Sequence, residues 1–211
     1  MDNTNYKSQC GQDEYCYENF FKNKKNGTFL EIGCLDGIKY SNTYFFEKLG
    51  WNGICVEASP TQFKMLKENR NCICEEYAIT NKSNDIVEFT NIIGEADGLS
   101  GISTNYHGKG KRRVNRILRK RKCESQIVNV KTITINDLLE KHNIHNIDLC
   151  TIDIEGGEYE VIESTDFKKN KIKILLVENN YGEQRTKSFL ETKGYTLVGH
   201  VGADEVYKFM E

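Results

Sequence analysis

Two glycines that follow an apolar run near the N-terminus mark the first candidate binding site. Gly33 and Gly37 lie four residues apart, directly after the run TFLEI at residues 28–32. Glycine lets a backbone turn tightly and approach a ligand closely. Glu31 and Asp36 put two carboxylates beside this turn, an arrangement that repels phosphate. A ligand with a cationic centre and ribose hydroxyls fits it better, although an ordinary strand-to-helix turn would have the same residues.

A second acidic residue supports the same kind of ligand. Glu57 ends the apolar run 53–57 and lies 26 residues after Glu31. A carboxylate at the end of the second strand can accept hydrogen bonds from both ribose hydroxyls, as in dinucleotide sites. S-adenosylmethionine has a sulfonium, an α-amino group and a ribose, so the turn and Glu57 together point to this cofactor. The alternative is a surface glutamate at the start of a loop.

Two later apolar runs also end in polar residues. Asp153 and Glu155 follow one run and precede a double glycine, and Glu178 and Asn179 follow the next. Carboxylates at the carboxyl ends of buried strands are costly as packing choices, so they suit a cation or a proton acceptor. The oxygens of Asp153, Glu178 and Asn179 form a set that Mg²⁺ or Mn²⁺ prefers, and such an ion would lower the pKa of a bound hydroxyl. An exposed acidic loop, or direct substrate binding by Glu178, would explain the same residues.

These residues need a scaffold that brings strand ends together, and the chain has the pattern for one. Strands are expected at residues 28–32, 53–57, 71–79, 85–89, 127–130, 147–152, 171–177, 195–198 and 206–209, and helices at 41–49, 60–70, 135–142 and 183–193. This alternation is typical of βαβ units, whose right-handed crossovers cover both faces of a mostly parallel sheet. Ligands of such sheets bind beyond the carboxyl ends of the strands, where the candidate residues lie.

One segment interrupts the alternation. Residues 91–126 form a long insertion, and its portion 100–108 is rich in glycine, polar and aromatic residues. Loops of this kind commonly close over substrates, so we expect a lid over an acceptor. Tyr106 would stack on a sugar ring, and His107 is a candidate general base, although a lone loop histidine is more often merely solvated.

The same insertion contains a strongly basic run. Residues 109–122 (KGKRRVNRILRKRK) include nine lysines and arginines and no acid, whereas the whole chain has a net charge of −2. Val114, Ile117 and Leu118 recur at helical spacing, which predicts a basic amphipathic helix. The run suits a polyanion contact with nucleic acid, an anionic membrane or an anionic glycan. A solvated face balanced by the acidic remainder is the alternative.

Length and composition restrict the remaining possibilities. A chain of 211 residues with 38% hydrophobic and 28% charged residues predicts a single domain over 1–211. No apolar run approaches the roughly 20 residues of a membrane span, and the polar, acidic N-terminus does not look like a signal peptide. The eight cysteines contain no CxxC and no zinc-type spacing, so we expect reduced thiols and a cytoplasmic location.

Taken together, these motifs resemble the FkbM family of S-adenosylmethionine-dependent methyltransferases over nearly the whole chain. The main matching segments are SQCGQD at residues 8–13, FLEIGCLDGIKYSNTYFFEKLGWNGICVEASP at 29–60, LSG at 99–101, IDLCTIDIEGGE at 147–158, VENNY at 177–181 and DEVY at 204–207. The combination is specific, whereas each piece alone is not. The resemblance implies a Rossmann-like α/β fold with a seven-stranded sheet, mostly parallel with an antiparallel last strand, and helices on both faces. It also implies methyl transfer, commonly to oxygen in sugars or natural products.

The resemblance also implies roles for individual residues. The cofactor-binding residues would be Glu31, Gly33, Asp36, Gly37, Ser41, Asn42, Glu57, Ala78 and Asp153. Of these, Ser41 and Asn42 would meet the carboxylate end of the cofactor, near a helix N-terminus. Glu57 would hold its ribose, and Ala78 would border its adenine. Leu35 stands where the family more commonly has glycine, which changes loop packing more than chemistry.

The leading interpretation is an O-methyltransferase that acts on a hydroxyl of a sugar or glycan. Asp153, alone or through a metal ion, would deprotonate the acceptor while Glu155 and Glu178 position it. Alignment and desolvation would supply the rest of the catalysis. The abundance of Asn, Lys and Ile indicates an A/T-rich genome, and compact glycan-modifying relatives in large DNA viruses look similar. A deoxysugar such as rhamnose is therefore a reasonable acceptor.

Two other interpretations remain open. An RNA 2′-O-methyltransferase would use Lys39, Asp153, a later lysine and Glu205 as a catalytic set, with the basic run 109–122 holding phosphates. Glu178 stands where the second lysine is expected, which weakens this interpretation. The third possibility is a non-catalytic cofactor-binding scaffold, against which the intact acidic residues argue.

Overall fold

A seven-stranded sheet organises the structure, a computed structural model that describes residues 6–106, 108–121, 123–180 and 182–210. The strand order is β10-β11-β9-β8-β1-β2-β3. The five neighbouring parallel strands are β1 (Thr28–Ile32), β2 (Asn52–Glu57), β3 (Ile73–Glu76), β8 (Asn146–Ile152) and β9 (Lys171–Glu178). Strand β11 (Asp204–Phe209) runs antiparallel to both β9 and β10 (Tyr195–Val201). The expected Rossmann-like sheet with an antiparallel last strand is confirmed.

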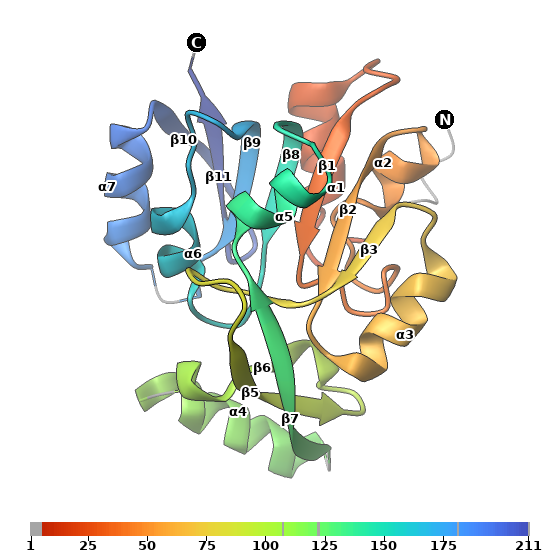
Figure 1. Cartoon of the computed structure of the whole chain (residues 1–211), viewed down its shortest axis with the longest axis vertical. Coiled ribbons are helices and arrows are strands. Elements are labelled where there is room, and N and C mark those ends of the chain that lie inside the picture. Colours follow the sequence, from red (N-terminus) through yellow and green to blue (C-terminus); the bar gives the residue numbers. More distant parts are fainter. Residues whose placement is uncertain (1–5, 107, 122, 181, 211) are drawn as a thin grey trace.

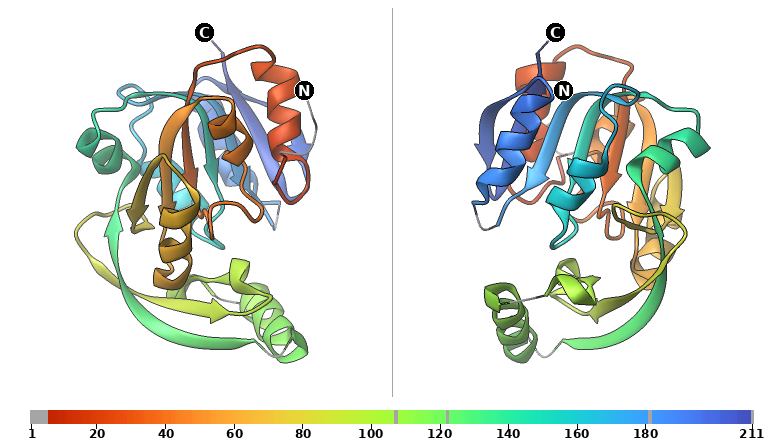
Figure 2. Two further views of the ribbon diagram at one scale, coloured as in Figure 1. Left: turned by 90° about the vertical axis from the view of Figure 1, so that its right-hand side faces the viewer. Right: turned by 60° about the vertical axis from the view of Figure 1, so that its left-hand side comes forward.

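Helices cover both faces of this sheet (Figure 2). Helices α5 (Ile135–Lys141), α6 (Glu158–Ser164) and α7 (Gln184–Thr192) contribute to the core on one face. The other face packs against α1 (Gln12–Cys16), a π-helical turn (Tyr17–Phe21), α2 (Tyr44–Lys48) and α3 (Pro60–Asn69). The central strands are buried on both faces, which explains why they read as continuous apolar runs.

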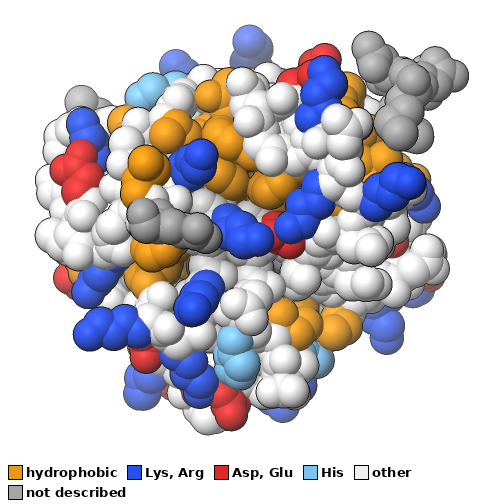
Figure 3. Space-filling model, turned by 90° about the horizontal axis from the view of Figure 1, so that it is seen from above, with side chains coloured by type: hydrophobic (Ala, Val, Ile, Leu, Met, Phe, Trp, Pro, Cys, Tyr) orange, Lys and Arg blue, Asp and Glu red, His pale blue; other side chains and the backbone are white. Residues whose placement is uncertain are grey.

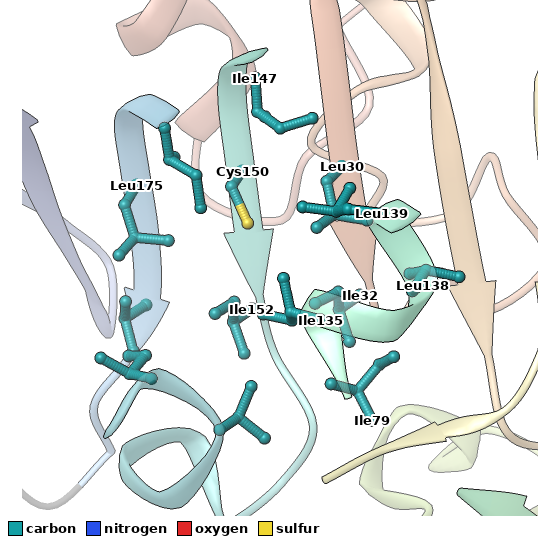
Figure 4. Packing of buried hydrophobic residues seen from close by; sticks show 14 of the residues in the cluster. Leu30, Ile32, Ile79, Ile135, Leu138, Leu139, Ile147, Cys150, Ile152 and Leu175 are labelled. Carbon is teal, nitrogen blue, oxygen red and sulfur yellow. The ribbon is translucent and has the colours of Figure 1, made fainter. Parts of the chain in front are cut away.

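The core of the first face is shown in Figure 4. Leu30 and Ile32 of β1 lie two residues apart and therefore point to the same side of the sheet. They meet Leu138 and Leu139 of α5, both of which are fully buried. Burying each such side chain stabilises the fold by about 1.5–3 kcal/mol. This packing fixes the positions of the strand ends where the candidate residues lie.

Local signals explain where two helices begin. The Ser59 side chain accepts a hydrogen bond from the amide of Gln62, and Pro60 occupies the first turn of α3. The expected helix 41–49 is shorter, because α2 begins only at Tyr44. Ser41 and the two residues after it bind the carboxylate of Glu31 instead of continuing the helix.

The expected strand 71–79 is in fact two strands that belong to different sheets. Strand β3 ends at Glu76, and β4 (Ala78–Ile79) pairs with β7 (Glu124–Ile133). The second sheet has the order β4-β7-β5-β6 and includes β5 (Ile86–Ile93) and β6 (Gly101–Ile102). Strands β5 and β7 extend beyond the expected 85–89 and 127–130 as an antiparallel ribbon with many exposed positions.

The second sheet and the basic helix form a layer beneath the carboxyl ends of the parallel strands (Figures 1 and 2). Helix α4 (Gly108–Arg121) is the basic helix expected from the run 109–122. Two short 3-10 turns (Asp97–Leu99 and Ser103–Asn105) connect it to β5 and β6. The expected insertion 91–126 therefore includes most of this layer. None of the helices in the described part of the chain has the length and apolar character needed to span a bilayer.

Candidate active site

A cavity of about 260 Å³ lies between the two layers. Residues that follow β1, β2 and β8 line one side, and residues of β5, β6 and α4 line the other. Strands β1 and β8 are neighbours in the sheet although they are far apart in the sequence. The chain order of the strands changes direction between them, and parallel sheets bind ligands at this kind of switch point.

The turn after β1 brings its backbone against the end of β8. Gly33 has a φ angle of 87°, and a Cβ atom there would lie 1.8 Å from the carbonyl oxygen of Asp153. Any side chain would therefore push the two strand ends apart. The amide nitrogens of Gly33 and Cys34 donate to the carbonyl oxygen of Val56 at 2.9 and 3.3 Å. Gly33 lines the cavity, as the sequence predicts.

Glu31 lies behind the cavity wall rather than in it. The residue is 2% exposed, and its carboxylate accepts hydrogen bonds from Ser41 Oγ at 2.8 Å, the Asn42 amide at 2.6 Å and Thr43 Oγ1 at 2.6 Å. The buried guanidinium of Arg70 lies 3.3 Å from the same carboxylate. Glu31 and Ser41, expected to contact the cofactor, are instead positioned to hold the 41–43 loop because their polar atoms are occupied within the protein.

Asp36 and Gly37 also lie outside the cavity lining and shape the turn. Asp36 Oδ1 accepts hydrogen bonds from the amides of Ile38 and Lys39 at 2.8 and 2.7 Å. Gly37 has a φ angle of 82°, and a Cβ atom there would lie 2.6 Å from the Leu66 side chain. Both residues keep the loop close to α3, and neither is among the residues that line the cavity.

Glu57 lies in the cavity wall at the end of β2. Its two carboxylate oxygens accept hydrogen bonds from the amides of Leu35 at 2.8 Å and Ser59 at 2.7 Å. Burial raises the pKa of Glu57 to about 7, although these amide donors counteract the shift. The amide of Ala58 also interacts with this carboxylate, which still retains acceptor capacity for a ribose hydroxyl because two carboxylate oxygens offer about four acceptor sites.

Two polar atoms beside the cavity lack hydrogen-bond partners among the described residues. They are Oδ1 of Asn42 and Oγ1 of Thr151, and both residues line the cavity. An unpaired buried polar atom is costly, and such atoms commonly mark ligand positions. Asn42 Oδ1 can accept a hydrogen bond from the cofactor's α-amino group, and Thr151 Oγ1 can donate one to its carboxylate. The sequence predicts Asn42 but misses Thr151, which resembles any other strand residue.

Apolar side chains from both layers line another part of the cavity. Tyr77, Ala78 and Ile79 contribute at β4, and Phe89 and Ile102 contribute from β5 and β6. Such a surface suits the flat, apolar faces of adenine. Ala78, the predicted adenine neighbour, lines this part of the cavity, whereas Phe89 and Ile102 become visible only once the second sheet is known.

Asp153, Glu155 and Glu178 come together on the sheet side of the cavity. Carboxylate oxygens of the three residues lie within 4.8 Å of one another, and all three residues line the cavity. Asp153 and Glu178 lie at the ends of the adjacent strands β8 and β9. Glu155 has a φ angle of 55°, a left-handed conformation that is uncommon outside glycine. We call these three residues the carboxylate cluster.

Burial and mutual repulsion raise the pKa values of the carboxylate cluster. The accessible surface of Asp153 faces the cavity. Burial is the main cause that raises its pKa well above the usual value, and the negative charge of Glu178 is the second. Burial and the charge of Asp153 raise the pKa of Glu155 to about 7, against the opposing effect of Arg113. Burial and the charge of Glu155 raise the pKa of Glu178 to about 8. At neutral pH the cluster therefore retains protons unless a cation neutralises it.

Asn179 does not belong to the carboxylate cluster. Its Nδ2 donates to the carbonyl oxygen of Glu183 and to Glu205 Oε1, both at 3.0 Å, and its Oδ1 accepts from the Glu183 amide at 2.8 Å. The side chain is thus used to close the loop after β9. Glu155 takes the place that the sequence analysis gives to Asn179 among the metal ligands.

A second group of potential ligands, Glu31, Cys34 and Cys55, does not suit a metal ion. Their ligand atoms also lie within 4.8 Å of one another. The Glu31 carboxylate, however, is already occupied by loop hydrogen bonds. Burial raises the pKa of the Cys34 thiol to about 12, so the thiolate that a metal requires is disfavoured.

The residues of an RNA 2′-O-methyltransferase set are only partly brought together, because Lys39 and Asp153 line the cavity but Glu205 does not. Lys39 Nζ forms an ion pair with Asp97 Oδ1 at 2.7 Å, and Glu205 accepts hydrogen bonds from Asn179 and Tyr207. Glu178 occupies the position expected for the second lysine. This arrangement disfavours the RNA interpretation.

The two aromatic candidates of the insertion differ in what can be said of them. Tyr106 packs against the apolar side of α4, and its hydroxyl donates to the carbonyl oxygen of Leu99. Its ring is therefore part of the second layer's packing and does not line the cavity. His107, the candidate general base, lies outside the described residues.

The N-terminal segment supplies a further wall of the cavity. Gln12 of α1 lines it, and Gln12 Nε2 donates to Asp204 Oδ2 at 2.9 Å. Burial raises the pKa of Asp204, and this hydrogen bond counteracts the shift. Asp204 pairs with Glu178 across strands β11 and β9, so Gln12 helps to fix the surroundings of the carboxylate cluster.

Comparison with known proteins agrees with this arrangement. The family model described as the methyltransferase FkbM domain matches residues 31–210, which include both layers and every cavity wall except the N-terminal one. A search among curated proteins gives no match. The glycine turn, the acidic residue after β2 and the unpaired polar atoms suit the methyl donor that this family uses. The chain belongs to the FkbM family of S-adenosylmethionine-dependent methyltransferases.

Proposed function

We propose that the protein transfers a methyl group from S-adenosylmethionine to a hydroxyl of a sugar or glycan, with a deoxysugar such as rhamnose as a reasonable acceptor. The observation that supports this proposal most strongly is the carboxylate cluster (Asp153, Glu155 and Glu178), which lines the same cavity as Gly33 and Glu57, two of the residues proposed to hold the cofactor. A sugar hydroxyl is a weak nucleophile that needs a proton acceptor beside it. Carboxylates also provide several acceptor oxygens for neighbouring sugar hydroxyls.

The cofactor would be held at its polar groups. Glu57 would accept hydrogen bonds from the ribose hydroxyls, and Asn42 Oδ1 and Thr151 Oγ1 would bind the amino-acid portion. Ala78 and Phe89 would enclose the adenine. When bound, S-adenosylmethionine supplies an electrophilic methyl group on its sulfonium.

The reaction requires one proton acceptor and correct alignment. The acceptor hydroxyl oxygen forms a bond to the methyl carbon while the carbon–sulfur bond breaks, and Asp153 takes the hydroxyl proton. The raised pKa of Asp153 makes its ionised form a stronger base than an ordinary carboxylate. Glu155 and Glu178 would orient the acceptor by accepting hydrogen bonds from its hydroxyls. The second layer would exclude water from the reacting atoms.

We also propose that Mg²⁺ or Mn²⁺ binds to the carboxylate cluster. Three carboxylates within 4.8 Å of one another repel each other when ionised, and a hard divalent cation bound between them would neutralise this repulsion. The ion would lower the pKa of a coordinated acceptor hydroxyl and relieve the repulsion within the cluster. Asp153, Glu155 and Glu178 would hold it.

The test is incubation with radiolabelled S-adenosylmethionine and a panel of neutral, phosphorylated and nucleotide-linked sugars, with and without EDTA. We expect label in at least one sugar and none in RNA. Label in RNA but not in sugar would show that the acceptor is not a sugar. Full activity in EDTA would show that methyl transfer does not require a metal ion. Binding of the cofactor without methyl transfer to any acceptor would favour the alternative that the protein is a non-catalytic cofactor-binding scaffold.

A further inference from the structure

Helix α4 is attached to the second layer by an apolar stripe. Val114 is 6% exposed and packs in a cluster with Ile92 and Ala96, and the partly buried Ile117 and Leu118 pack against the same cluster. This contact fixes the rotation of the helix about its axis. It therefore decides which basic side chains face the cavity and which face the solvent.

One edge of α4 forms part of the cavity wall. Arg113, Ile117 and Arg121 line the cavity, and residues four apart lie on the same side of a helix. With a rise of 1.5 Å per residue, the two arginine positions are about 12 Å apart along the helix axis. Both side chains are long and flexible, so their guanidinium groups can converge on an anion that lies between the two backbone positions.

Both arginines keep free donors. Arg113 Nη1 lies 3.6 Å from Glu155 Oε2, a long ion pair. Arg121 Nη1 donates to the carbonyl oxygen of Glu95 at 3.1 Å. Because each guanidinium has five N–H donors, most of the donors at this wall are available to a ligand.

The charges in the cavity are unevenly distributed but not fully separated, because Lys39 follows β1 whereas Glu95 and Asp97 belong to the second layer. The carboxylates Glu57, Asp153, Glu155 and Glu178 lie at the ends of the parallel strands, and they suit the cationic cofactor and sugar hydroxyls. Arg113 and Arg121 line the cavity from α4, and Arg113 lies beside Glu155 of the carboxylate cluster. An acceptor with hydroxyls near the strand ends and an anionic group near α4 would match both the carboxylates and the arginines.

The other cations of α4 increase the positive charge around these arginines. In the described ranges no acidic side chain pairs with Lys111, Arg112, Arg116, Arg119 or Lys120. Lysine and arginine side chains also occur at the opposite end of the molecule, where they lie among uncharged, apolar and acidic groups (Figure 3), whereas those of α4 lie on one helix whose sequence contains no acidic residue. Such a local excess attracts a polyvalent anion more than a single carboxylate.

We propose that the acceptor carries phosphate near the methylated hydroxyl, and that Arg113 and Arg121 of α4 bind this phosphate while the carboxylate cluster binds the sugar. The inference rests on the proposed function, since it specifies the acceptor of that same site. Arginine binds phosphate through two parallel charge-assisted hydrogen bonds. A sugar linked to a nucleoside diphosphate and a sugar of a phosphate-linked glycan share this chemistry.

A small phosphate ester fits α4 better than a nucleic acid does. The helix sequence GKGKRRVNRILRKR has no aromatic residue on which bases could stack. The two arginines line a cavity of about 260 Å³, which they share with the carboxylate cluster. The helix therefore offers recognition of one anionic group beside the reacting sugar.

Calorimetric titration of the protein saturated with S-adenosylhomocysteine tests the inference without requiring methyl transfer. The ligands are uridine diphosphate glucose, glucose 1-phosphate, the neutral methyl α-glucoside and polyuridine RNA. We expect the phosphorylated ligands to bind at least about tenfold more tightly than the neutral glucoside. Tighter binding of uridine diphosphate glucose would identify a nucleotide-linked acceptor, and equal binding of the two would identify a phosphate-linked one.

Matched substitutions on the same helix separate the cavity-facing arginines from the general charge. Arg113→Gln and Arg121→Gln should each weaken binding of glucose 1-phosphate by about tenfold, whereas Arg119→Gln, an exposed position that does not line the cavity, should change it by less than about twofold. Equal effects of all three, equal binding of the neutral glucoside, or RNA binding that displaces glucose 1-phosphate would overturn the inference. If phosphate binding holds but no sugar is methylated, the proposed function fails and the phosphate site remains.

Discussion

Replacing Glu178 with glutamine should stabilise the metal-free protein at alkaline pH. The Glu178 carboxylate lies within 4.8 Å of those of Asp153 and Glu155, and burial together with the charge of Glu155 raises its pKa from 4.5 to about 8. A carboxyl group whose pKa is higher in the folded than in the unfolded chain favours folding only while it is protonated. The stability that this proton provides is complete below pH 4.5 and is lost as the pH rises through about 8.

The pKa difference sets the size of the effect. The two values differ by about 3.5, and each pH unit corresponds to about 1.4 kcal/mol, so an ionised Glu178 costs the folded state at most about 5 kcal/mol. Protonation of Asp153 or Glu155 relieves part of the same repulsion. We therefore expect Glu178→Gln to gain about 2–3 kcal/mol above pH 8, or about 5–10 °C in melting temperature for a chain of this length.

Thermal unfolding in EDTA, at about pH 5 and above pH 8, measures this gain. The matched control is Glu68→Gln, because Glu68 is an exposed residue of α3. We expect the gain of Glu178→Gln to shrink at the lower pH and the control to show none. Added Mg²⁺ or Mn²⁺ should stabilise the wild type more than the Glu178 variant. A Glu178 variant that is less stable than the wild type above pH 8 in EDTA would refute the argument from repulsion.

Three further predictions concern the cofactor and the proton acceptor. Asp153→Asn should lower methyl transfer by about 10²-fold or more without lowering the melting temperature, and near-normal turnover in a labelled-methyl assay would exclude Asp153 as the proton acceptor. Thr151→Val should weaken S-adenosylmethionine binding by about two- to tenfold, because it removes the unpaired hydroxyl, while leaving the fold as stable or more stable; unchanged affinity in calorimetry would show that Thr151 does not contact the cofactor. Affinity for S-adenosylmethionine should rise as the pH passes about 7, where Glu57 ionises and becomes a stronger acceptor, and Glu57→Gln should lack this rise; a pH profile that is the same in both proteins would contradict the ribose role.

The main sheet could be predicted from the sequence because its central strands are buried on both faces and separated by helices. The second sheet could not. Residues 71–79 form one continuous strand-like run, and nothing in their pattern indicates that the chain leaves one sheet at Glu76 and enters another at Ala78. Strands β5 and β7 have many exposed side chains, so their apolar patterning ends before the hydrogen-bonded ribbon does.

The candidate site shows the same division. Gly33, Glu57 and Asp153 lie in the cavity wall as expected, since their positions follow directly from the strand ends. Glu31 lies behind the wall because Arg70 and the 41–43 loop occupy its carboxylate, and these partners are 10 to 39 residues away in the sequence. Thr151 gives no signal in the sequence, because only the absence of a partner for its hydroxyl marks it.

The way in which the chain passes between the two layers has a consequence for how this enzyme can diversify. It leaves the main sheet through a single residue, Tyr77, and returns through a single residue, Thr134, to helix α5, which packs on that sheet. These crossings lie side by side, because Ala78 and Ile79 pair with Thr132 and Ile133. Everything between β5 and β7 can therefore be lengthened, shortened or exchanged by recombination without altering the strands that carry Gly33, Glu57 and Asp153. Selection can in this way remodel the side of the cavity formed by β6 and α4 while Gly33, Glu57 and Asp153 are inherited unchanged.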